Sequence, residues 1–96
     1  MERLAKVKSV APMRTFETSD YNGNKREVKV VEIEMQSGFD NFVVSAFDKT
    51  AEQIDTLGLK EGAYYFISLS LRAQTVEKDG KKTFFNRLVL EKIEEI

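Results

Sequence analysis

The chain has 96 residues, no cysteine or histidine, and a formal net charge of −1. This length fits one domain with one hydrophobic core, and the lack of both residue types excludes disulfides, thiolate chemistry and most zinc or copper sites. Because the net charge is close to zero, any nucleic-acid site has to be a local basic patch. No apolar run approaches the roughly 20 residues of a membrane span, and residues 1–6 lack a signal-peptide pattern. The absence of cysteine is compatible with a reducing cytoplasm.

The first half of the chain alternates apolar and polar residues, a pattern typical of β-strands. Residues 4–16 predict a long first strand that bends near Pro12, because proline cannot donate a hydrogen bond to a neighbouring strand. An Asn-Gly turn follows, and a second strand is expected over residues 26–35. In that strand the apolar parity shifts between Val30 and Val31, which predicts a β-bulge.

Three more strands and one helix follow. They are expected over residues 39–47 (strand), 49–56 (helix), 64–76 (strand) and 82–93 (strand). Asp48 is the expected N-cap of the helix, and Gly58 is suited to end it. Asp79 and Gly80 form a dipeptide that favours a tight hairpin between the last two strands.

Five strands with one helix between the third and the fourth are the element order of the OB-fold, a small β-barrel. We therefore expect an all-β, five-stranded OB-fold barrel, with residues 1–96 as a single OB-fold domain. The runner-up is another small antiparallel barrel or a half-sandwich. The helix carries apolar residues at helical spacing that would plug one end of the barrel: Ala51, Ile54 and Leu57. The expected core face of the fourth strand comprises Tyr65, Ile67, Leu69, Leu71 and Ala73.

Four short segments, in this order and spacing, resemble the bacterial single-stranded DNA-binding (SSB) protein family. They read VSAFDKTAE (44–52), LKEG (59–62), LR (71–72) and DGKKTF (79–84). The resemblance implies an OB-fold that binds single-stranded DNA, usually as a cytoplasmic homotetramer. The chain departs from the family in having no tryptophan, so Phe47 is the one stacking aromatic that the resemblance retains.

Non-specific binding of single strands needs exposed aromatic rings for base stacking and cations for the phosphates. OB-folds use strands two and three and the loops that join strands one to two and four to five. On that surface we predict the following nucleic-acid-binding residues: Arg14, Phe16, Tyr21, Lys25, Arg26, Asn41, Phe47, Arg72, Lys78, Lys81 and Lys82. Glu32 and Glu34 count against this interpretation because they point outward from the second strand.

Tyr64 and Phe66 are outward-facing aromatics on the fourth strand and predict a homo-oligomer interface, in a dimer or a tetramer. The alternative function is an OB-fold module for protein interaction or oligomerisation, in which the lysines are merely solvated. No nucleophile–base pair with catalytic spacing is visible, and the segment 20–24 departs from a calcium loop in its glycine position. We therefore expect no enzymatic activity, metal or cofactor, and single-stranded DNA or RNA as the partner.

Overall fold

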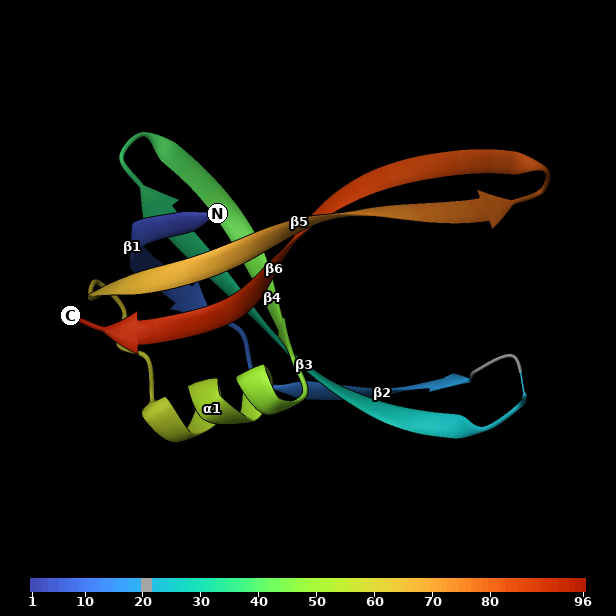
Figure 1. The fold of residues 1–96 in the computed structure, drawn as a ribbon, viewed down its shortest axis with the longest axis horizontal. Helices are drawn as coiled ribbons and strands as arrows, with labels where there is room; N and C mark the ends of the chain where they lie inside the picture. The colour runs from blue at the N-terminus through green and yellow to red at the C-terminus, as the bar shows by residue number, and fades with distance from the viewer. Residues whose placement is uncertain (20–21) are drawn as a thin grey trace.

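The computed structural model describes residues 1–19 and 22–96. These described residues form six strands and one helix (Figure 1): β1 (Glu2–Val10), β2 (Arg14–Ser19), β3 (Lys25–Ser37), β4 (Asp40–Phe47), α1 (Lys49–Leu57), β5 (Tyr64–Lys78) and β6 (Lys81–Glu95). Among the described residues, no helix has the length and apolarity that crossing a membrane requires.

Five of these strands form a closed ring. The hydrogen-bonded order is β1-β5-β6-β4-β3, and β1 also pairs with β3, which closes the barrel. All pairings are antiparallel except β4–β6, where Val44 and Ser45 lie beside Leu88 and Val89 in parallel. The expected OB-fold barrel is therefore confirmed.

The first predicted strand is divided in two. β1 ends at Val10 and β2 begins at Arg14, so the break falls on the predicted bend around Pro12. The chain remains attached to β3 here, because the amide of Ala11 donates to the carbonyl oxygen of Glu32 at 2.9 Å. This division is why the helix follows β4 and not the third strand; the element order is otherwise as predicted.

The core lies inside the barrel and under α1. Its largest fully buried side chains are Ile33, Met35, Leu90, Val7 and Val44. From α1, Ala51 and Ile54 are buried against the barrel, and Leu57 packs on them while partly exposed. The helix therefore covers one end of the barrel (Figure 1), as its apolar spacing predicts.

The prediction of a bulge in the second expected strand, which is β3 in the structure, is wrong. The register of β3 with β2 and β4 is continuous, and the irregularities lie in β1, between Val7 and Ser9, and in the β5–β6 pairing. Val30 and Val31 are each 2% exposed. Both faces of β3 are thus covered at this point, so consecutive apolar residues are buried without a bulge.

Asp48 precedes α1 as predicted, but it is not a side-chain cap. Its backbone has a φ of 49°, and its side chain makes no capping hydrogen bond. The carboxylate instead faces β3, where it accepts from the backbone amide of Lys29 at 3.3 Å and pairs with Arg26 at 2.7 Å. The carboxylate of Asp48 thus binds Arg26 and the amide of Lys29 instead of the helix amides that an N-cap side chain would bind. Gly58 ends the helix in the left-handed conformation, and its amide donates to the carbonyl of Ile54.

Two hairpins project from the barrel (Figure 1). We call residues 14–19 and 22–27 the first arm, formed by β2 and the start of β3, and residues 71–87 the second arm, formed by the end of β5 and the start of β6. The second arm turns at Asp79 and Gly80, which both have positive φ as a two-residue hairpin turn requires. The predicted core face of β5 therefore ends at Leu69. Leu71 is 60% exposed and Ala73 is exposed, because beyond Leu69 the strand has left the barrel.

Candidate nucleic-acid interface

The outer face of β4 holds the predicted stacking residue. Val44 and Ala46 point into the core, so Val43, Ser45 and Phe47 lie on the opposite side of the strand, as the alternation predicts. Phe47 is half-buried at the end of β4, beside Val30 of β3 in register. The ring is thus outside the core cluster but is not fully exposed.

Arg87 covers the ring of Phe47. Its guanidinium carbon lies 5.6 Å from the ring centroid, a distance at which a cation is attracted to the face of an aromatic ring. The two side chains belong to a hollow of about 220 Å³ at the base of the second arm, which we call the slot. The slot is lined by Phe47, Arg72, Ala73, Gln74, Arg87 and Val89. Neither Arg87 nor Gln74 was among the predicted site residues.

Arg72 lies directly opposite Arg87 in the β5–β6 register, so two guanidinium groups share one face of the second arm. Arg72 is held by Glu91 at 3.1 Å, and Glu91 also accepts from the hydroxyl of Ser70 at 2.6 Å. The Ser70 hydrogen bond, followed by Arg72, holds the pKa of Glu91 below its ordinary value. The carboxylate therefore stays ionised and pairs with Arg72, one of the two arginines on this face.

The first arm brings together three predicted residues on one face. In register, Arg14 lies beside Val30, Phe16 beside Val28, and Arg26 beside Thr18, so these side chains share the face that continues the outer surface of β3. Phe16 is exposed, whereas both arginines are engaged by carboxylates: Arg14 pairs with Glu32, and Arg26 pairs with Asp48. Lys25 lies on the other face of the arm, and Tyr21 is outside the described residues.

The second arm carries an excess of positive charge. Residues 72–87 contain five cationic side chains and two carboxylates, although the whole chain has a net charge of −1. The cross-strand register places Lys78 and Lys81 on the face that carries Arg72 and Arg87, and Lys82 on the opposite face. We call these three residues the tip lysines.

Two aromatic residues of the second arm were missed by the sequence analysis. Phe85 is 48% exposed and lies beside Gln74, on the slot side of the arm, and Phe84 is 73% exposed on the other side. The sequence contained a signal for the position of Phe85. Leu88 and Leu90 form an apolar set on one face of the strand, and they alternate with Phe85, Arg87 and Val89. That alternation assigns Phe85, Arg87 and Val89 to the outer face.

Asn41 is not brought to this site. It lies at the start of β4, six residues from Phe47, which at the rise of a strand corresponds to about 20 Å. Its amide oxygen accepts from the amino group of Lys8 at 3.3 Å. Asn41 thus belongs to the opposite end of the strand.

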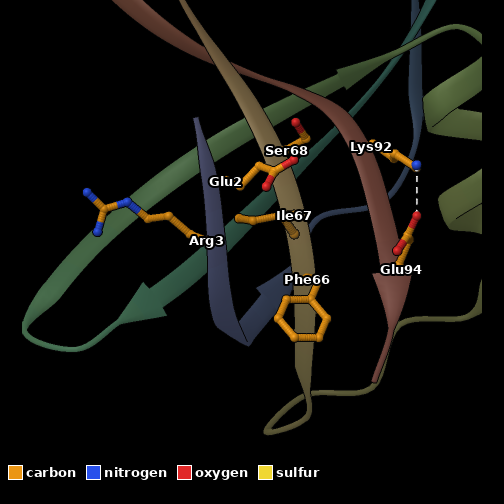
Figure 2. Close-up of a pocket in the computed structure, with 7 residues that line it drawn as sticks. All are labelled: Glu2, Arg3, Phe66, Ile67, Ser68, Lys92 and Glu94. Carbon is orange, nitrogen blue, oxygen red and sulfur yellow. Dashed lines mark ion pairs between the residues drawn. The ribbon is translucent and has the colours of Figure 1, made fainter.

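The predicted oligomer residues form a separate surface on β1 and β5. Tyr64 and Phe66 are each 52% exposed, and Leu4, the register partner of Phe66, is also exposed. Figure 2 shows Phe66 among the charged residues that border this surface, including Lys92, which pairs with Glu94 at 2.9 Å. The pairing with Glu94 raises the pKa of Lys92. An apolar patch with a charged rim is typical of an interface.

Metal ligands are not concentrated anywhere in residues 1–19 and 22–96: no group of three or more Asp, Glu, His or Cys side chains lies close enough together to hold an ion.

The chain is similar in structure to the second OB-fold domain of replication protein A from Methanococcus maripaludis. The two share 14% sequence identity with a TM-score of 0.65, over 99% of this chain and 81% of that one. At this identity the likeness establishes the OB-fold. No protein-family model matches the sequence, and no curated protein matches it.

Proposed function

We propose that this protein is a non-catalytic, SSB-like protein that binds single-stranded DNA through base stacking and phosphate contacts. The observation that carries the proposal is the second arm. Its slot-side face carries four cations (Arg72, Arg87, Lys78 and Lys81) and the exposed Phe85, and at its base this face meets Phe47 on the outer face of β4. Stacking surfaces and cations are the two components that sequence-independent binding of single strands requires. The likeness to an OB-fold domain of replication protein A supports the same choice.

The two kinds of contact have separate places on the protein. Phe47, Phe85 and Phe16 offer ring faces to bases, and the tip lysines offer charge to phosphates along the second arm. Since every base has a π-face and every nucleotide a phosphate, we expect little sequence preference. Single strands exposed during DNA replication in the cytoplasm are the substrate that this proposal favours.

The test is a fluorescence-anisotropy titration of a labelled oligonucleotide at several salt concentrations. Binding should weaken steeply as salt rises, because each phosphate contact releases a counterion. A duplex of the same sequence should compete poorly, since paired bases hide their faces. Equal affinity for duplex and single strand, or binding that ignores salt, would refute the proposal.

A second candidate function, oligomerisation through the β1–β5 surface, is favoured by the exposed patch of Leu4, Tyr64 and Phe66. The two functions use different surfaces and are compatible, so a homo-oligomer could bind single strands through several slots. If the protein forms an oligomer but binds no oligonucleotide, the role as a protein-interaction module is the correct one.

A further inference from the structure

Arg87 differs from the other arginines of the chain in its partners. The other four each pair with a carboxylate: Arg3 with Asp40, Arg14 with Glu32, Arg26 with Asp48, and Arg72 with Glu91. Arg87 has no carboxylate partner within the part of the chain that the structure describes, and its guanidinium lies over the ring of Phe47. Phe47, the ring at the end of β4, is therefore covered by Arg87, the one arginine without an ion pair among these residues.

We propose that Arg87 and Phe47 form the two walls of a slot that takes a single nucleobase, with the base sandwiched between the guanidinium plane and the phenyl ring. This inference rests on the proposed function and deepens it. It assigns Arg87 to base stacking, a contact distinct from the phosphate contacts expected of the tip lysines.

The dimensions of the slot suit this role. A base between two flat groups needs one carbon–carbon contact distance on each side, or about 7 Å in all. The present separation is 5.6 Å, so the slot has to open by about 1.4 Å, the difference between these two values. Arg87 is exposed and lies on the arm outside the barrel, and a long side chain can move this far without any change in the core. In the free protein Arg87 thus occupies the place that the base would take.

The chemistry of the walls also suits a base. A guanidinium group is planar and weakly hydrated and stacks on aromatic faces, whereas the ammonium group of lysine is a strongly hydrated point charge. The remaining polar lining includes the amide of Gln74, which both donates and accepts and can therefore meet the edge of any base. Val89, 8% exposed, supplies an apolar floor.

The experiment compares a thymidine oligonucleotide with an abasic strand of the same length, which keeps the phosphates and removes the bases. The variants are Arg87→Lys, which keeps the charge and loses the plane, and Arg87→Gln, which loses the charge. Arg3→Lys is the matched control, because it makes the same change on β1, where Arg3 pairs with Asp40. Because Arg87 is exposed and has no ion pair among the described residues, thermal melting should show only small changes in Tm, the largest for Arg87→Gln, which loses the cation–ring contact with Phe47.

If Arg87 stacks on a base, Arg87→Lys should lower affinity for the thymidine strand by about 5-fold or more, the lower end of the effect of losing one stacked base. Its affinity for the abasic strand and its salt dependence should remain those of the unaltered protein. Arg3→Lys should change neither affinity.

Other outcomes separate this inference from the proposed function. If Arg87→Lys binds both strands normally while Arg87→Gln weakens both and reduces the salt slope, Arg87 contacts a phosphate; the sandwich is then wrong and the function stands. If the unaltered protein binds both strands equally well, binding does not depend on bases, and both the slot and the base-stacking part of the proposed function are refuted. If it binds neither strand, both proposals fail.

Discussion

Replacing Phe47 by Ala tests the candidate site most directly, because the core and the binding surface predict different patterns for this residue. Phe47 is half-buried on the outer face of β4, beside Val30 and under Arg87. Cutting a fully buried Phe to Ala costs about 3–5 kcal/mol, and roughly half of that burial is present here. Including the lost contact with Arg87, we expect about 2 kcal/mol of destabilisation, or a fall in Tm of roughly 8–16 °C for a domain of this size.

The loss in binding should be of similar size but of a different origin. One base stacked on an aromatic ring is worth about 1–3 kcal/mol, so the affinity for a single strand should fall about 5- to 150-fold. Phe47→Leu separates the two effects, since leucine fills the half-buried position and has no ring face. It should cost less than about 1.5 kcal/mol of stability and still lose the binding.

The assays are urea unfolding followed by circular dichroism and anisotropy titration of a labelled oligonucleotide, on the same protein samples. Phe39→Ala is the control, because Phe39 is fully exposed just before β4, at the end of the strand opposite Phe47. It should change neither stability nor binding. If Phe47→Leu binds as tightly as the unaltered protein, the ring is not a stacking surface and the reasoning about the site is wrong.

The remaining predictions concern charge and assembly. Replacing all three tip lysines by Gln should weaken binding to all sequences alike. It should also reduce the salt slope by about 2, at roughly 0.7 per lost phosphate contact. Three Gln replacements at lysines outside the arms should leave the affinity and the salt slope unchanged. Replacing Tyr64 and Phe66 by Ser should convert an oligomer into a monomer, as measured by light scattering. Weak interfaces populate at about tens of micromolar protein. If the unaltered protein is already an 11.0 kDa monomer at that concentration, the interface prediction fails. The lowered pKa of Glu91 means that its contribution to stability is present above its ordinary pKa of 4.5 and is lost as the pH falls through the folded-state value; Glu91→Gln should therefore flatten the acid side of the stability–pH profile. By releasing Arg72, the same substitution should also strengthen oligonucleotide binding, and an unchanged affinity would show that Arg72 takes no part in it.

Turn chemistry and local alternation account for the features that the sequence predicted well. Asp79 and Gly80 tolerate positive φ, Gly58 accepts the left-handed conformation that ends a helix, and Pro12 interrupts strand pairing. These effects act between neighbours in the chain, so the positions of the strands, of the helix and of the bend at Pro12 follow from the sequence. The outward position of Phe47 follows from the same alternation.

Whether an outward side chain is covered, and by what, depends on residues distant in the sequence. Alternation alone predicted that Leu71 belongs to the core, but β5 leaves the barrel before it and nothing packs on that face. The pairing of Arg72 with Glu91 joins residues 19 positions apart, and the contact of Arg87 with Phe47 joins residues 40 positions apart. The sequence by itself thus determined the strands, the turns and the barrel, because those depend on local geometry and periodic burial. Only the tertiary structure decided which cations are neutralised and which ring is covered, because those depend on distances that barrel closure and the curvature of the two arms create.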